Sequence, residues 1–252
     1  MTRINNETGR QVIITPNFLK HPEGSVLIET GDTKVICTAS VQNRVSDWLR
    51  GKGKGWITAE YAMLPRANES RNNREGQFGK WPSSRSQEIQ RLIARTLRAS
   101  IWAARLGEIT ITIDCDVIQA DGGTRTASIT GGWVALALAL EKLQAEGRIK
   151  KQPMKRQVAA ISTGIVKGEV LLDLEYTEDS NADVDLNIAA DENGNIIELQ
   201  ATGEKNVFKP AELFAMTELG LKGISSLHEI QKLTLESVGI SMGSLLQSPE
   251  DL

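Results

Sequence analysis

Apolar and polar positions alternate with the period of a β-strand along the first third of the chain. Short β-branched or alternating runs, separated by turn signals such as Gly31-Asp32, predict strands at 12–15, 25–29, 34–41 and 56–64. A polar stretch at 65–84 follows, rich in Arg, Asn, Gly, Pro and Ser. Connections of this length are usually functional or disordered, so this loop is the first candidate for a binding element.

The period then changes to that of an α-helix. Apolar positions such as Ile89, Leu92, Ile93 and Leu97 predict a helix over 85–104, with Ser84 and Gln87 as a capping box at its start. An alternating run predicts a strand over 108–118, and a long apolar run predicts a helix over 124–146 that ends before a glycine.

The second half of the chain repeats this mixture. It predicts strands at 158–166, 170–175, 184–190 and 196–201, with Asn193-Gly194 as a hairpin turn, and two helices at about 210–221 and 226–237. Residues 239–252 are polar and are expected to form a frayed tail. The order of elements predicts an α+β fold with mixed sheets, organised as a single domain over 1–238.

The strongest local signal lies between the strand at 108–118 and the helix at 124–146. Two glycines, Gly122 and Gly123, leave backbone N–H groups uncovered at a helix N-terminus, which is a physical anion site. Arg125 and the hydroxyls of Thr124, Thr126 and Ser128 are expected to sit over it. The alternative is a tight turn that needs glycines for its backbone conformation alone. The spacing matches neither a Walker loop nor a dinucleotide fingerprint.

Charge is segregated along the chain, although the net charge is only −3. Residues 44–105 contain thirteen Lys and Arg against five acids, whereas 169–204 contain eleven acids and no Lys or Arg. A basic half favours a polyanionic partner, and the acidic segment favours either a divalent cation or a face that pairs with the basic half. The alternative is a solvated charged surface without a partner.

Several basic residues are candidates for anion binding. Arg85 opens a predicted helix, where a cation is tolerated best beside a bound anion; the alternative is an exposed arginine without a ligand. The long loop carries Arg66, Arg71 and Arg74, which suit contacts to backbone phosphates, and Phe78 and Trp81, which suit stacking on bases; the alternative is a disordered solvated loop. The segment 51–55 resembles a phosphate loop, but no helix signal follows it, so a flexible basic connection is favoured.

Three carboxylates lie close together at Asp179, Asp183 and Asp185. If a strand begins near Asp183, that residue and Asp185 face one side, and Asp179 can reach it from the preceding turn. Such oxygen ligands suit Mg²⁺ or Mn²⁺ with water and substrate phosphate completing the shell; the alternative is acidic surface. Arginines for anions and carboxylates for a metal, without an obvious base, together favour phosphoryl transfer.

The remaining composition excludes some classes of protein. The sequence contains no apolar run of membrane-spanning length and no apolar segment of a signal peptide at its start, so we expect a cytoplasmic location and no membrane partner. Cys37 and Cys115 lie in apolar strands and are expected to be buried and unpaired. The two histidines are isolated, which argues against a histidine triad or a histidine-rich zinc site.

These residues resemble the ribonuclease PH family. The resemblance extends over about residues 3–235 and is carried by collinear motifs at 55–61, 63–66, 88–93, 115–131 and 173–180. It implies the RNase PH-like fold, similar to domain 2 of ribosomal protein S5. It also implies a phosphorolytic 3′→5′ exoribonuclease that trims tRNA 3′ ends and other structured RNA precursors, releases nucleoside diphosphates, and forms a homohexamer as a trimer of dimers.

The resemblance also implies roles for individual residues. Phosphate is held by Arg85, Gly123, Thr124 and Arg125; the metal, Mg²⁺ or Mn²⁺, is held by Asp179 and Asp185; tRNA is bound by Arg66, Arg71 and Arg74. Arg85, Arg125, Asp179 and Asp185 are the expected catalytic residues, with inorganic phosphate as co-substrate.

The sequence departs from the family pattern at four places. Ser83-Ser84 replaces a usual Gly-Gly, the segment 76–82 is altered, Trp133 replaces a smaller residue, and an Asp-Gly-Arg motif near the N-terminus is not recognisable, with only Arg3 nearby. None of these departures removes a predicted phosphate or metal residue, so we expect activity. The rivals are a non-catalytic RNA-binding ring subunit and hydrolytic cleavage at the same metal site.

Overall fold

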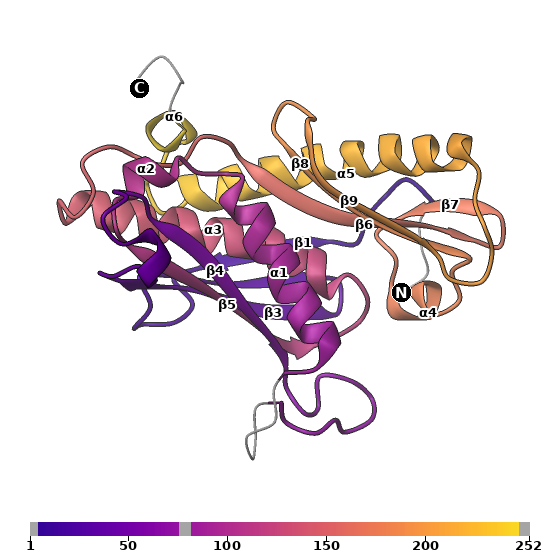
Figure 1. Ribbon diagram of the computed structural model, residues 1–252. Coiled ribbons are helices and arrows are strands. Elements are labelled where there is room, and N and C mark those ends of the chain that lie inside the picture. Colours follow the sequence, from indigo (N-terminus) through magenta and orange to yellow (C-terminus); the bar gives the residue numbers. More distant parts are fainter. Residues whose placement is uncertain (1–4, 76–81, 247–252) are drawn as a thin grey trace.

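The computed structural model describes residues 5–75 and 82–246, which are organised around two β-sheets (Figure 1). Within these residues the first sheet has the order β1-β2-β3-β5-β4 and contains β1 (Val12–Pro16), β2 (Gly24–Thr30), β3 (Thr33–Gln42), β4 (Trp56–Met63) and β5 (Thr110–Gln119). Neighbouring strands are antiparallel except β4, which runs parallel to β5. Cys37 on β3 lies opposite Cys115 on β5 in the strand register. Both cysteines are buried and form no disulfide, as predicted.

The second sheet is antiparallel throughout the described residues and has the order β7-β6-β8-β9. It contains β6 (Val158–Val166), β7 (Glu169–Leu172), β8 (Val184–Asp191) and β9 (Ile196–Gly203). The turn between β8 and β9 has Gly194 in the left-handed region, at φ 78°, as the Asn-Gly signal predicts. The predicted α+β fold is therefore confirmed, with one mixed sheet and one antiparallel sheet in the described residues.

One long helix joins the two sheets. Helix α3 (Thr124–Ala145) packs against β2 and β3 of the first sheet and against β6 of the second. Its residues from Thr126 to Leu140 are all buried, which is the pattern expected for a helix that is apolar on every side. A short turn, 120–123, leads from β5 into α3, and residues of the second sheet line the same cleft as the N-terminus of α3.

The other long helices also pack against the sheets, one beside α3 on the first sheet and one on the second sheet (Figure 1). Helix α1 (Ser84–Arg98) packs against β4, and α5 (Pro210–Glu236) packs against β6, β7 and β8. Shorter turns of helix are η1 (Asp47–Leu49), α2 (Ala103–Leu106), α4 (Tyr176–Asp179) and α6 (Met242–Leu245). In the described part of the chain, no helix combines the length and the apolar character needed to cross a membrane.

The predicted helix over 85–104 is wrong at both ends. Ser83, not Ser84, is the N-cap of α1, because its hydroxyl accepts a hydrogen bond from Ser86 N at 3.1 Å. The helix ends at Arg98, since the chain leaves it to form a β-bridge between Ile101 and Met154. Tertiary pairing therefore overrides a helical pattern that continues in the sequence.

The two helices predicted at 210–221 and 226–237 are one continuous helix. Gly220 and Gly223 lie at or beside the predicted break, and they allow α5 to approach the second sheet closely. A Cβ atom on Gly220 would lie 2.7 Å from Ile188 Cγ2, and one on Gly223 would lie 2.8 Å from Ile161 Cδ1. These glycines therefore serve packing and do not end the helix.

The segment after α5 is more ordered than the predicted tail over 239–252. Ile240 is 9% exposed, and Leu245 in α6 is fully buried against the first core. The expectation of a frayed tail is wrong up to Leu246, because two apolar side chains in a polar stretch suffice to anchor it. Residues 247–252 lie outside the described residues.

Candidate active site

The turn between β5 and α3 has the backbone conformation that the glycine pair predicts. Gly122 has φ 73° and Gly123 has φ 65°, both in the left-handed region. A Cβ atom on Gly122 would lie 2.3 Å from the carbonyl oxygen of Leu174, so a side chain cannot be accommodated there. The buried hydroxyl of Thr33 fixes the turn by donating to Gly122 O at 2.6 Å and accepting from Asp121 N at 2.9 Å.

The hydroxyls at the start of α3 do not all face the anion site. Thr124 lies at the edge of the anion site. It forms a buried hydrogen bond with Tyr61, in which the two side-chain oxygens are 2.9 Å apart. Thr126 Oγ1 donates to Gly123 O, and Ser128 Oγ donates to Thr124 O. The expectation that all three cover the anion site is wrong for Thr126 and Ser128, because helical spacing turns them into the core.

A cleft of about 580 Å³ opens in front of this turn. Three parts of the chain line it: the loop after β4, the N-termini of α1 and α3, and the second sheet with α4. The predicted phosphate and metal residues that line it are Arg85, Gly123, Thr124, Arg125, Asp179 and Asp185. The structure therefore brings together all six residues that the resemblance selects for phosphate and metal, from α1, the start of α3, α4 and β8.

Arg125 is held in place on the floor of this cleft. Its side chain is 16% exposed, and Nη1 donates to Gln200 Oε1 at 3.1 Å and lies 3.8 Å from Glu88 Oε1. Gln200 in turn donates to Glu88 at 3.0 Å. Arg85, the second residue of α1, is exposed and lines the same cleft, so one arginine is fixed and the other faces solvent.

Asp185 lines the cleft from β8 of the second sheet, and Asp179 lines it from the end of α4. Burial raises the pKa of Asp185 to about 6; the negative charge of Asp179 adds to this rise, and the charge of Arg125 and a hydrogen bond from Asn187 oppose it. Burial also raises the pKa of Asp179, opposed by the positive charges of Arg125 and Arg85. The carboxylates and arginines thus act on one another across the cleft.

Asp183 does not join these two aspartates. Strand β8 begins at Val184, and the Asp183 carboxylate accepts a hydrogen bond from Asn206 Nδ2 at 2.7 Å. Among the described residues, no three His, Cys, Asp or Glu side chains converge to form a metal site. Two carboxylates nevertheless fit Mg²⁺, which retains several waters and commonly binds through one or two carboxylates together with substrate phosphate.

The long loop contributes to the cleft through residues other than its arginines. Asn68, Glu69, Ser70 and Asn72 line the cleft. Arg66, Arg71 and Arg74 are exposed and are not among the lining residues, so the structure leaves them beside the cleft and open to solvent. The other two candidates of this loop, Phe78 and Trp81, lie outside the described residues, as does most of the altered segment 76–82.

The remaining sequence candidates have structural roles. The basic loop at 51–55 does not line the cleft; Gly51 N and Gly53 N donate to Glu108 Oε1 at 2.6 and 3.3 Å. Trp133 is fully buried and donates to Arg156 O, so it fills the core.

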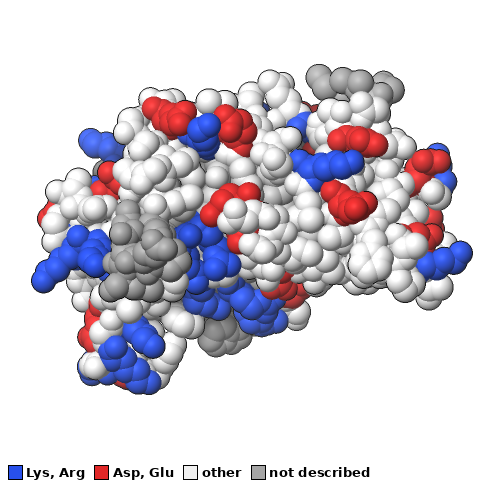
Figure 2. Space-filling model, turned by 90° about the horizontal axis from the view of Figure 1, so that it is seen from above, with Lys and Arg blue, Asp and Glu red and all other residues white. Residues whose placement is uncertain are grey.

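The face in Figure 2 shows the largest groups of Lys and Arg towards the left-hand half of the molecule, with acidic side chains scattered more widely.

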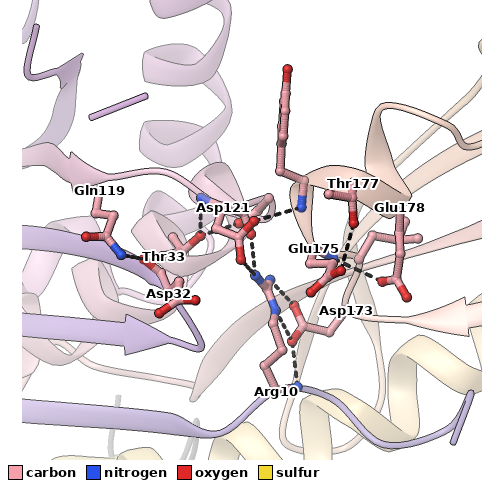
Figure 3. Close-up of polar contacts among 12 residues, drawn as sticks. Arg10, Asp32, Thr33, Gln119, Asp121, Asp173, Glu175, Thr177 and Glu178 are labelled. Atoms are coloured by element: carbon pink, nitrogen blue, oxygen red, sulfur yellow. Dashed lines mark hydrogen bonds and ion pairs between the residues drawn. The ribbon is translucent and has the colours of Figure 1, made fainter. Parts of the chain in front are cut away.

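Arg10 is the residue that sequence reasoning missed. It lies just before β1, and its guanidinium contacts both Asp173 and Asp121, as Figure 3 shows. The available signal was Gly9-Arg10 next to the first predicted strand, an arginine beside a residue type that permits a sharp turn. A single arginine near a chain end carries no periodicity, so the pattern could not select it.

Comparison with known proteins gives the same architecture. The model of the 3′ exoribonuclease family, domain 1, matches residues 8–140, and that of domain 2 matches residues 156–223. The chain resembles rice Rrp46 at 21% identity and a TM-score of 0.74, covering 92% of this chain and 97% of that one. It resembles an Archaeoglobus fulgidus exosome structure with RNA bound to the active site at 20% identity and a TM-score of 0.73, covering 89% of each chain.

A third similar structure is an archaeal exosome core, at 20% identity and a TM-score of 0.72, covering 90% of this chain and 89% of that one. At these identities the solved structures support the fold, and the family models support membership. The first model alone spans more than half of the chain, and the two together include every element that lines the cleft. The chain therefore belongs to the 3′ exoribonuclease (RNase PH) family.

Proposed function

We propose that this protein is a phosphorolytic 3′→5′ exoribonuclease that removes nucleotides from tRNA 3′ ends and similar structured RNA precursors. The observation that carries the proposal is the juxtaposition of two arginines and two aspartates, Arg85 and Arg125 with Asp179 and Asp185, around one cleft. Arginines suit phosphate oxygens, and carboxylates suit a hydrated divalent cation. This combination fits a reaction in which positioning and charge neutralisation are the main requirements.

Inorganic phosphate is proposed to bind at the N-terminus of α3. The backbone N–H groups around Gly123 and Thr124 and the guanidinium of Arg125 offer hydrogen bonds, and the helix dipole favours a negative charge there. The contact of Arg125 with Gln200 fixes the direction of its guanidinium, so little side-chain freedom remains to be lost on binding. Arg85 completes the site from the solvent side.

The proposed reaction needs no catalytic histidine, because phosphate is already ionised. A phosphate oxygen attacks the phosphorus of the last phosphodiester, and the bond from that phosphorus to the 3′-oxygen of the preceding nucleotide breaks. The departing 3′-oxygen takes up the proton that hydrogen phosphate brought. The products are an RNA shortened by one nucleotide, with a 3′-hydroxyl, and a nucleoside diphosphate whose β-phosphate is the former nucleophile.

Asp179 and Asp185 are the residues proposed to hold Mg²⁺ or Mn²⁺. When bound, the ion neutralises charge on the scissile phosphate. The two aspartates repel one another in the buried setting that raises their pKa values, so a cation held by them would relieve an unfavourable charge pair. Arg125 lessens the same repulsion from the other side of the cleft.

The loop after β4 is proposed to guide RNA to the cleft. Arg66, Arg71 and Arg74 are exposed on the loop whose polar residues line the cleft, so they are free to contact the phosphates of a strand that enters it. By the same resemblance we propose a homohexameric ring, a trimer of dimers. The rival function is an RNA-binding ring subunit without catalysis, to which the exposed arginines would be equally suited.

One assay separates these functions. The purified protein is incubated with a tRNA precursor and Mg²⁺, with and without inorganic phosphate, and the released nucleotides are identified by mass. Phosphate-dependent release of nucleoside diphosphates supports the proposal. Nucleoside monophosphates in both conditions indicate hydrolysis, and salt-dependent tRNA binding without release indicates the non-catalytic subunit.

A further inference from the structure

We propose that Arg10 is a positioning residue that joins the phosphate turn to the segment carrying the metal-site aspartates. This inference rests on the proposed function, since it assigns Arg10 the task of keeping the two sides of the cleft at their working separation. The two sides come from different sheets: Gly123, Thr124 and Arg125 follow β5, whereas Asp179 follows β7. A contact that spans both segments can therefore set the geometry of the site.

Arg10 forms a two-pronged ion pair with Asp173. Nε donates to Asp173 Oδ2 at 2.9 Å, Nη2 donates to Oδ1 at 2.6 Å, and the backbone N of Arg10 also donates to Oδ2 at 2.8 Å. The side chains of Arg10 and Asp173 are only 15% and 4% exposed. Such a planar, charge-assisted pair fixes direction as well as distance.

The same guanidinium reaches the phosphate turn. Arg10 Nη1 donates to the carbonyl oxygen of Asp121, the last residue before Gly122 (Figure 3). A Cβ atom on Gly123 would lie 3.1 Å from Arg10 Nη2, so the guanidinium packs directly beneath the turn. One side chain therefore bonds to the turn on one side and to Asp173 on the other.

Asp173 directs the chain into α4. It has φ 55°, in the left-handed region, and its backbone N donates to Ser162 O at 2.7 Å. This conformation is uncommon for a residue with a side chain and persists where surrounding contacts hold it. Six residues later the chain reaches Asp179, so a change of backbone at Asp173 would move that carboxylate.

The turn and the segment before α4 already touch. A Cβ atom on Gly122 would meet Leu174 O at 2.3 Å, and Tyr176 N donates to Asp121 Oδ1 at 3.1 Å. Arg10 lies beside this junction but does not line the cleft, so in the described structure it has no direct path to phosphate or RNA. Its effect on the reaction therefore passes through the residues that it holds and through its positive charge, which opposes the rise in the pKa of Asp179.

A second arginine offers a matched control. Arg95 in α1 makes a two-pronged ion pair with Glu198 in β9, with Nε–Oε2 at 2.8 Å and Nη2–Oε1 at 2.6 Å. This pair also links the two halves of the molecule, because α1 packs on the first sheet and β9 belongs to the second. Neither residue lines the cleft or contacts the phosphate turn. If activity required only contact between the two halves of the molecule, weakening either ion pair would lower it alike. If activity requires the positioning proposed here, only weakening the Arg10 pair would lower it.

The test compares Arg10→Lys, Asp173→Asn and Arg95→Lys. Lysine keeps the charge but cannot form the planar pair, and asparagine keeps the shape and tolerates a positive φ. For each variant, kcat, the KM for phosphate, the KM for RNA and the Mg²⁺ requirement are measured at a temperature where the protein is fully folded. Phosphate affinity is measured separately by titration calorimetry.

We expect Arg10→Lys and Asp173→Asn to lower kcat/KM for phosphate by roughly 10- to 100-fold, since small displacements of a positioned group have effects of this size. Phosphate affinity should fall and the Mg²⁺ requirement should rise, with the KM for RNA changed little and Arg95→Lys similar to wild type. The inference is overturned if both site variants match wild type, or if Arg95→Lys loses as much. Should wild type release no nucleoside diphosphate, the proposed function is wrong, and phosphate affinity alone then decides the inference.

Discussion

Tyr61 Oη lies 2.9 Å from Thr124 Oγ1, and both side chains are buried. This hydrogen bond ties β4 to the first residue of α3, so the strand that precedes the arginine loop is joined to the turn that faces the cleft. Burial raises the pKa of the Tyr61 phenol, opposed by its hydrogen bond with Thr124 and by the charges of Arg85 and Arg125. The hydroxyl therefore stays neutral across the physiological range.

Replacing Tyr61 by Phe should reduce stability. The ring remains in the core, but the Thr124 hydroxyl loses its partner in a buried position, which costs about 1–3 kcal/mol. Urea denaturation measures the change, with Tyr176→Phe as the control because Tyr176 is 58% exposed. Equal stabilities of Tyr61→Phe and wild type would show that the hydrogen bond contributes nothing.

Removing the fixed arginine of the cleft should remove most activity. Losing one preorganised donor to a transition state typically lowers the rate by about 10²–10³-fold, and we expect this loss for Arg125→Ala. Steady-state phosphorolysis measures it, with Arg148→Ala as a control for the loss of an arginine that does not line the cleft. Near-wild-type phosphorolysis by Arg125→Ala would rule out its assignment to phosphate.

The metal requirement should depend on pH through Asp185. Its pKa of about 6 means that the carboxyl becomes protonated as the pH falls through that value, so Mg²⁺ binding should weaken below about pH 6. Asn187 Nδ2 donates to Asp185 Oδ2 at 3.0 Å and favours the ionised form. Asn187→Ala should therefore raise the pKa and move the loss of Mg²⁺ binding to a higher pH. Titrations of Mg²⁺ from pH 5.5 to 8 test this, and a shift to lower pH would contradict it.

A second carboxyl, Asp114 on β5, should limit stability at neutral pH. Burial raises its pKa to about 6, and the charge of Glu60 adds to the rise. The folded-state pKa is above the unfolded value, so stability is greatest below the unfolded pKa and falls as the pH rises towards and through 6. Asp114→Asn removes this loss.

Thermal unfolding of wild type and Asp114→Asn at pH 4 and pH 8 tests this effect of the Asp114 charge. Asp114→Asn should have a higher Tm than wild type at pH 8 and nearly the same Tm at pH 4, where the wild-type carboxyl is neutral. Thr38, whose hydroxyl lies 3.4 Å from Asp114 Oδ2, can donate to the amide oxygen as well. A lower Tm for the variant at pH 8 would show that the ionised carboxylate stabilises the fold.

Local patterns predict the strands and the cleft well. Strand β6 has the predicted bounds, Val158–Val166, because a continuous apolar run admits few alternatives. Local features point to the glycine pair and to the acidic cluster, but the choice of Asp179 and Asp185 without Asp183 came from the family resemblance, and the residues so chosen line one cleft. Their chemical roles stay predictions until they are measured.

Contacts between distant segments were not predictable in this way. The end of α1 depends on a bridge from Ile101 to Met154, and the continuity of α5 depends on close packing at Gly220 and Gly223. Arg10 contacts Asp173, which lies 163 positions later in the sequence. Such pairings have no signature within a window of neighbouring residues, and so pattern analysis passes over them.

In the proposed reaction inorganic phosphate is the nucleophile. Incubation of tRNA with Mg²⁺ and phosphate labelled with ³²P, followed by separation of the released nucleotides, tests it most directly. The account predicts that every released nucleoside diphosphate carries one labelled phosphate, in the β position, and that release stops without phosphate. Unlabelled nucleoside monophosphates, or tRNA binding without any labelled product, would contradict it.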